Sequence, residues 1–125
     1  MGITTLTVRI RNEADPANVA ELAMLVDSGA IFSVVPSDVL DRLGIRPYGT
    51  EQFFLADGTA IARQVGTAFF EVDDCRGASK VIFGEPGDAA LLGAITFESL
   101  GLMLDPLKRQ LRPMRLMPAA VAAAP

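Results

Sequence analysis

Asp27 and Ser28 place a carboxylate and a hydroxyl at the end of an apolar run, in the stretch LVDSGAIFSVV from Leu25 to Val35. A charged group inside a core is costly unless it is paired or held in its neutral form. The position of Asp27 therefore predicts either a turn that reaches water or a site with a chemical role. In the first case, Asp-Ser-Gly is only a turn whose aspartate accepts hydrogen bonds from nearby backbone N–H groups.

The rest of the composition narrows the chemistry that Asp27 could perform. The 125 residues include no histidine and a single cysteine, Cys75. The lack of histidine excludes Ser-His-Asp triads, Cys-His dyads and the usual zinc sites. Cys75 lies in DDCRG, a predicted turn, so we expect a structural role for it rather than a nucleophilic one. Hydrolytic chemistry would then have to depend on carboxylates, lysine or an oxygen-ligated metal.

Four loop carboxylates could in principle bind a hard cation. Their spacing matches no metal-binding loop, so we predict that they are solvated and that the chain has no metal site and no cofactor. These residues are Asp73, Asp74, Glu85 and Asp88.

Charge and hydropathy limit the partners. The formal net charge is −4, without a long acidic or basic block, which argues against nucleic acid. No signal peptide is visible, and no apolar run approaches the roughly 20 residues that a helix needs to cross a bilayer. We therefore expect no membrane partner and a cytoplasmic location. Because half of the residues are hydrophobic, the chain is expected to fold with a real core.

The elements that must position Asp27 are mostly strands, because apolar residues alternate along much of the chain. The turn sequence Asp57-Gly58 between two apolar runs predicts a hairpin over 51–66. Two short helices are expected, one over 36–44 with Ser37 as N-cap and Gly44 past its end, the other over 94–101. Further strands are predicted at 5–10, 19–26, 31–35, 67–72, 80–83, 90–93, 102–105 and 109–113, and a turn over 73–79.

These strands are too short and too closely spaced for βαβ crossovers, so we predict an all-β fold, a small barrel or sandwich with one or two short helices. The pattern predicts one domain over residues 1–112. The Pro- and Ala-rich segment 113–125 is predicted to be a flexible tail.

A weak internal repeat supports this organisation. The stretches LVDSGAIFSVVPSDVLDRLGI and LLGAITFESLGLMLD share one order: an apolar strand end, a glycine, apolar residues, a short helix and Leu-Gly. A duplicated half-domain would produce this order. Only the first copy carries an aspartate.

The combined pattern resembles a known family. An apolar residue followed by Asp-Ser-Gly-Ala, two further residues and Ser-Val-Val begins at Val26, and Leu-Leu-Gly with a short helix follows about 65 residues later, with LADGT between them. This arrangement is similar to that of the retropepsin-like aspartic proteases, over residues 4–112. The resemblance implies an acid-protease β-barrel with one half-lobe per chain, which works as a homodimer.

The resemblance also implies a mechanism for a peptide or protein substrate. The two copies of Asp27 would meet across a two-fold axis, and because two carboxylates in one site cannot both ionise easily, the pair would hold one proton. One carboxylate would act as general base towards water and the other as general acid towards the peptide carbonyl. The implied activity is that of an aspartic endopeptidase without metal or cofactor.

By the same resemblance, the neighbours of Asp27 acquire roles. Ser28 would hydrogen-bond across the dimer axis, the N–H of Gly29 would face a carboxylate, and Ser33 could hydrogen-bond locally. Three groups of residues complete the implied site: the active-site loop Ser28, Gly29 and Ala30; the counterpart motif Leu91, Leu92 and Gly93, packed beneath that loop; and a flap over the substrate formed by Ala56, Asp57, Gly58 and Thr59.

Two alternatives remain at this point. Ile31, Phe32, Ala94 and Ile95 stand where well-studied viral members carry polar or charged residues, so the chain could be a catalytically weak or inactive module for dimerisation or peptide binding. The chain could also be a small β-barrel ligand binder in which Asp-Ser-Gly is only a turn. For Asp57, a hairpin-tip role is the default, with a substrate contact as the alternative.

Overall fold

The computed structural model describes residues 4–105, 107–108 and 110–114, and these residues form a mainly β structure with two short helices. This confirms the fold class predicted from the sequence. The elements in chain order are β1 (Thr4–Asn12), β2 (Asp15–Val26), β3 (Ser33–Pro36), α1 (Ser37–Arg42), β4 (Gly49–Phe54), β5 (Ala60–Val72), β6 (Cys75–Gly84), β7 (Leu91–Leu92), α2 (Ala94–Ser99), β8 (Leu102–Asp105) and β9 (Gln110–Pro113).

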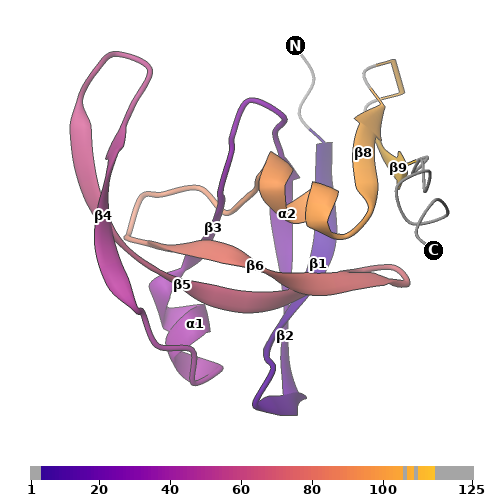
Figure 1. Ribbon diagram of the computed structural model, residues 1–125, viewed down its shortest axis with the longest axis horizontal. Helices are drawn as coiled ribbons and strands as arrows, with labels where there is room; N and C mark the ends of the chain where they lie inside the picture. The colour runs from indigo at the N-terminus through magenta and orange to yellow at the C-terminus, as the bar shows by residue number, and fades with distance from the viewer. Residues whose placement is uncertain (1–3, 106, 109, 115–125) are drawn as a thin grey trace, which may run out of the picture.

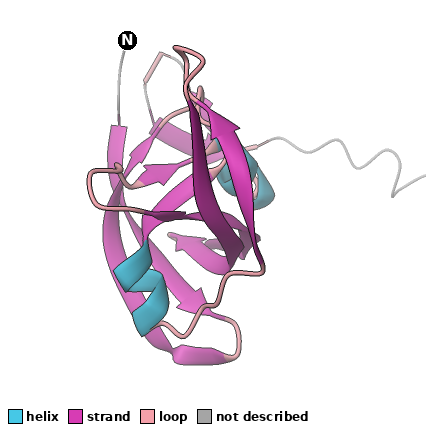
Figure 2. Cartoon of the chain, turned by 90° about the vertical axis from the view of Figure 1, so that its left-hand side faces the viewer, coloured by secondary structure: helices cyan, strands magenta, loops and turns pink. Residues whose placement is uncertain are grey.

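The main sheet closes on itself. Its strand order is β1-β2-β7-β3-β6-β5-β4, and β5 also pairs with β1, so β4 alone lies outside the ring (Figures 1 and 2). Most neighbours are antiparallel, but β2 pairs with β7 and β3 pairs with β6 in parallel. The chain makes these parallel pairings through long connections that contain hairpins, which the strand spacing alone did not predict.

Alternating side chains of the strands fill the barrel. Val8 and Ile10 of β1, Met24 and Val26 of β2, and Phe70 of β5 are almost completely buried. Each such side chain contributes about 1.5–3 kcal/mol by leaving water. The register is therefore fixed, because a slip by one residue would turn the apolar face of a strand to solvent.

Several strand boundaries differ from the sequence prediction, most of all at β2 and β6. β2 begins at Asp15 rather than Val19, and the predicted turn over 73–79 contains only Asp73 and Asp74, with Cys75 already in β6. The segment 75–79 lacks the β-branched and aromatic residues that mark a strand. The segment 75–79 is a strand because it pairs with β5.

The capping of α1 also differs. Its N-cap is Pro36, and Ser37 instead donates a hydrogen bond to the Gly84 carbonyl at 2.9 Å. Gly44 follows the helix with φ +74°, as its position predicted. Among the described residues, neither helix has the length and apolar character needed to span a bilayer.

The predicted domain boundary at residue 112 falls inside β9. Pro113 is the last residue of that strand, and the amide of Met114 donates to the Gly101 carbonyl at 2.7 Å. The rest of the predicted tail, residues 115–125, lies outside the described residues.

One hairpin projects from the barrel. β4 pairs only with β5, and β5 reaches its β6 neighbour at Val65, so residues 49–64 form a two-stranded arm, seen at the left of Figure 1. We call this arm the flap. Its turn is closed by hydrogen bonds from Leu55 N to Thr59 O and from Gly58 N to Leu55 O, at 2.8 and 2.9 Å.

Candidate active site

Asp27 lies in a tight loop directly after β2. The amide of Gly29 donates to Asp27 Oδ1 at 2.9 Å, and the amide of Ala30 donates to the Asp27 carbonyl at 3.1 Å. The expected contact between Gly29 and a carboxylate is thus present. In the single chain, Asp27, Ser28 and Gly29 are exposed, so the loop reaches water and no buried charge has to be compensated.

The motif Leu91-Leu92-Gly93 supports this loop. Leu25 and Val26 pair in parallel with Leu91 and Leu92, and the Asp27 amide donates to the Leu92 carbonyl at 3.3 Å. The start of α2 continues the contact, because the amides of residues 94 and 95 donate to the carbonyls of residues 30 and 31 at 2.8 and 3.0 Å. The structure therefore brings together the two motifs that the sequence singled out.

A buried group of hydroxyls lies beneath both motifs. Ser33 Oγ accepts the Gly93 amide at 2.9 Å and donates to Thr96 Oγ1, which is 3.0 Å from Ser79 Oγ. The sequence prediction of a local hydrogen bond for Ser33 is wrong, because these partners lie 60 and 63 residues away. Thr96 and Ser79 gave no signal in the sequence, where each is one small hydroxyl residue among many.

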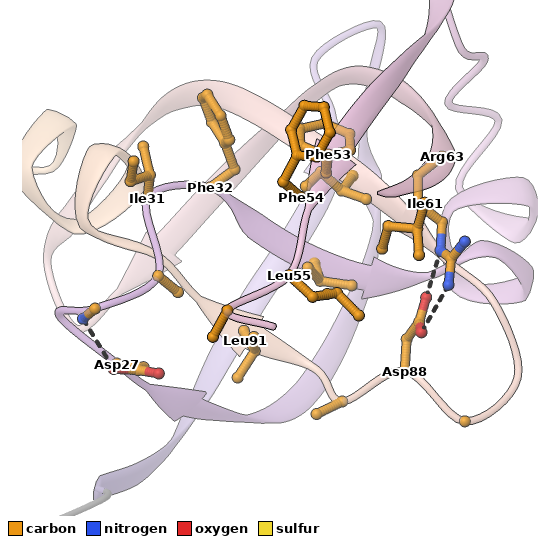
Figure 3. A pocket seen from close by; sticks show the side chains of 17 residues that line it. Asp27, Ile31, Phe32, Phe53, Phe54, Leu55, Ile61, Arg63, Asp88 and Leu91 are labelled. Carbon is orange, nitrogen blue, oxygen red and sulfur yellow. Dashed lines mark hydrogen bonds and ion pairs between the residues drawn. The ribbon is translucent and has the colours of Figure 1, made fainter. Parts of the chain in front are cut away.

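An apolar groove of about 680 Å³ opens beside Asp27 and runs beneath the flap (Figure 3). The charged residues that line it are Asp27 at one end and Arg63 and Asp88 at the other. The remaining lining is made of Gly29, Ala30, Ile31, Phe32, Val34, Phe53, Phe54, Leu55, Ala56, Ile61, Ile82, Gly87, Ala89 and Leu91.

The predicted flap residues divide into two groups. Ala56 lines the groove, whereas Asp57, Gly58 and Thr59 form the turn at the tip. The Thr59 amide donates to Asp57 Oδ1 at 2.9 Å, and hydrogen bonding by Thr59 lowers the pKa of Asp57 below its ordinary value. Gly58 has φ +88°, a conformation that favours glycine. Asp57 therefore has the hairpin-tip role that was its default.

The aromatic residue after the Asp27 loop is held from two sides. The Phe32 ring meets the Phe53 ring edge-on, with centroids 6.0 Å apart, and Lys80 Nζ lies 4.7 Å from the Phe32 centroid. Such contacts orient an aromatic ring in addition to burying it. Phe32 thus connects the segment after the Asp27 loop to β4 of the flap.

Arg63 and Asp88 form a bidentate ion pair at the far end of the groove, with Nε–Oδ2 at 2.8 Å and Nη2–Oδ1 at 3.1 Å. This hydrogen bonding by Arg63 is the main cause that lowers the pKa of Asp88. The prediction of Asp88 as a solvated loop carboxylate is therefore wrong. Nothing in the sequence marked the pair, because its members are 25 residues apart and follow no motif.

The described residues contain no group of three or more histidine, cysteine, aspartate or glutamate side chains that could hold a metal ion. Cys75 is a half-buried free thiol at the first position of β6, whereas the β6 residue that lines the groove is Ile82, near the other end of the strand.

Comparisons with known proteins agree with this geometry. A family model described as aspartyl protease matches residues 6–96, which include both motifs and the flap. The solution structure of a simian foamy virus (mac) protease matches with a TM-score of 0.54 and 23% sequence identity, covering 76% of this chain and 92% of that chain. No curated protein sequence gives a significant match. The structural likeness confirms the predicted retropepsin-like fold.

Proposed function

We propose, because this chain belongs to the aspartyl protease family, that two copies of it form a homodimeric aspartic endopeptidase. One observation carries the proposal: a single Asp27 per chain lies at the end of an apolar groove, on a loop braced by the Leu91-Leu92-Gly93 motif. One carboxylate cannot serve as both general acid and general base in one step. A second copy, related by a two-fold axis, supplies the missing one.

In the proposed mechanism the two Asp27 carboxylates share one proton, because two like charges in one site cannot both persist. The ionised member takes a proton from water, which attacks the peptide carbonyl. The protonated member donates its proton to the carbonyl oxygen, which gives a tetrahedral intermediate with two hydroxyl groups. The C–N bond then breaks as the carboxyl that took the water proton donates it to the leaving nitrogen, while the other carboxylate takes a proton from one hydroxyl, so that the pair again holds one proton. The Gly29 amide holds the carboxylate in place. In the proposed dimer, the exposed Ser28 of the same loop would hydrogen-bond with Ser28 of the second copy.

The groove supports an extended peptide as the substrate. Its lining is mostly apolar, and it lies between the flap and the barrel, so a peptide could add alongside strand edges while its side chains enter apolar pockets. Closure of the flap would exclude water other than the attacking molecule. We therefore expect cleavage next to apolar side chains.

Exposed apolar side chains near Asp27 support a second copy as the partner. Ile31 is 59% exposed and Ile95 is 43% exposed, and the two are joined by a backbone hydrogen bond of 3.0 Å. They lie where the resemblance places polar or charged groups. Burial of such side chains on association is favourable, so we propose that they contribute an apolar contact to the dimer.

The test is incubation of the purified protein with a mixed peptide library, followed by mass spectrometry of new termini, with Asp27→Asn as the matched variant. Asparagine keeps an oxygen that can accept the Gly29 amide but removes the ionisable group. We expect cleavage by the wild type and a loss of at least about a hundredfold in the variant. Identical peptide profiles would overturn the protease proposal and leave a peptide-binding or dimerisation module. A strictly monomeric protein in sedimentation equilibrium would contradict the shared site.

A further inference from the structure

The Arg63–Asp88 ion pair uses nearly all of the polar atoms that its members have. Two nitrogens of Arg63 bind the two Asp88 oxygens, and Nη1 donates to the Ala62 carbonyl at 2.9 Å. Asp88 Oδ2 also accepts the Glu85 amide at 2.8 Å. The side chains are 15% and 27% exposed. Because the pair is already satisfied within the chain, it is poorly suited to recognise a charge on a substrate.

The pair instead joins two walls of the groove. Arg63 lies in the flap, two residues before β5 first pairs with β6 at Val65. Asp88 lies in the loop between β6 and β7, and the next contact along that loop is the Leu25 amide donating to the Ala90 carbonyl at 3.0 Å. The tie therefore runs from the flap to the segment that supports Asp27, as Figure 3 shows at the right of the groove.

A second ion pair, between Glu51 and Lys80, connects the flap to β6 at the same level as Arg63. Glu51 faces Arg63 across the hairpin, yet it accepts a hydrogen bond from Lys80 of β6 at 2.7 Å instead of pairing with Arg63. Closer to the tip, the ring pair Phe53–Phe32 connects β4 of the flap to the segment just before β3. Both strands of the flap are thus held below its tip, while residues 54–60 extend past these contacts.

We propose that Arg63 and Asp88 are positioning residues that form the fixed pivot of the flap and thereby set the width of the peptide groove. This inference rests on the proposed function for its effect on catalysis. The pivot itself is a property of the single chain. A bidentate arginine–carboxylate pair suits this role because it fixes both distance and orientation. Motion of the flap then concentrates beyond the pivot, over the groove.

Asp88→Asn and Arg63→Gln test the pivot. The asparagine side chain in the first variant keeps an oxygen for the Glu85 amide, so this variant removes the charge while retaining the turn. With a peptide substrate found in the library experiment, we expect KM to rise roughly three- to tenfold in both variants and kcat to change less than about twofold. Arg63→Lys keeps the charge but loses the fork and should give an intermediate KM.

Hydrogen–deuterium exchange supplies a readout that needs no activity. Both variants should speed exchange of the amides of residues 52–62 by at least about threefold, because the flap opens more readily. Glu71→Gln is the matched control, since it removes the Arg11–Glu71 pair of 3.3 Å, which has similar exposure and lies outside the groove lining. It should change neither flap exchange nor KM.

The outcomes separate this inference from the proposed function. If the wild type cleaves no peptide, the endopeptidase proposal fails, and flap exchange alone decides on the pivot. If neither variant speeds flap exchange relative to Glu71→Gln, the pivot is wrong, whatever the activity. If exchange rises but KM does not change, the pair anchors the flap without setting the groove, and the positioning role is overturned.

Discussion

Position 93 requires a glycine because neighbouring backbone atoms leave no room for a side chain, and not because of its backbone conformation. Its φ of −87° and ψ of 167° are open to any residue. A Cβ atom at this position would, however, lie 2.5 Å from the carbonyl carbon of Phe32 and 2.7 Å from the carbonyl oxygen of Ile31. The two motifs approach each other so closely that the support of the Asp27 loop has no room for a side chain.

Gly93→Ala should therefore destabilise the protein by about 2–4 kcal/mol, because backbone atoms rather than a flexible side chain must move. Gly49→Ala is the matched control, since a Cβ there meets nothing within 4 Å. Its effect should stay within about 0.5 kcal/mol. Urea denaturation followed by circular dichroism measures both. Equal stability of the two variants would show that the loops can separate without cost.

At the residue scale, sequence reasoning succeeds where chemistry is concentrated in a short motif. The contact of the Gly29 amide with the Asp27 carboxylate could be predicted because the two residues lie two positions apart in one motif. Arg63 and Asp88 could not, because an ion pair between a strand and a distant loop depends on where the fold places them. Ser33 stands out as a polar residue in an apolar strand, but its partners could not be identified from the sequence.

At the scale of elements, the buried hydroxyls join β3, α2 and β6 beneath the active-site loop. Ser33→Ala leaves the buried Gly93 amide without its acceptor and should cost about 1–3 kcal/mol. Ser37→Ala removes a hydroxyl that donates to the Gly84 carbonyl at a half-buried position, so its cost should be lower. Thermal unfolding of the two variants compares them. If Ser37→Ala lowers the unfolding temperature more than Ser33→Ala does, the buried cluster of Ser33, Thr96 and Ser79 is not what holds the loops together.

Several of the strands and the flap could be predicted from local sequence patterns. Alternation of apolar residues marks β1 and β5, and the Asp57-Gly58 turn marks the flap, because these signals are local. The start of β6 escapes prediction because Cys75 to Ser79 become a strand only through pairing with β5. The parallel pairing of β3 with β6 connects segments far apart in the sequence, and no local pattern encodes it.

At the scale of the whole molecule, the described residues form one aspartate loop and one counterpart loop, each followed by a short helix. The internal repeat seen in the sequence corresponds to this arrangement: the Asp27 loop leads through β3 to α1, and β7 leads to α2. The two halves pack against each other within one chain, so the second half supports the Asp27 loop rather than adding a second carboxylate. In the proposed dimer, the second carboxylate would therefore come from another copy of the chain.

The pH dependence of the folding stability follows from three carboxylates other than Asp27. Hydrogen bonds lower the pKa of Asp57, Asp88 and Asp105 below the ordinary value of 3.8, through Thr59, Arg63 and Lys108 respectively. The unfolded chain therefore binds more protons than the folded chain near and below pH 3.8. Stability rises with pH in that window and is lost as pH falls through the lowered pKa values. The folded state should remain intact at mildly acidic pH.

The proposed sharing of one proton between two Asp27 carboxylates predicts activity that peaks at mildly acidic pH, where the folded state is still stable. Asp105→Asn separates the two effects, since Asp105 accepts the amides of Leu107 and Lys108 outside the groove and an asparagine oxygen can still accept them. Urea midpoints at pH 7 and pH 3 should differ less in this variant than in the wild type, while the pH–rate profile above pH 4 keeps its shape. A rate that climbs steadily through neutral pH would contradict the shared proton, because a pair that loses its last proton has no acid to donate to the peptide carbonyl.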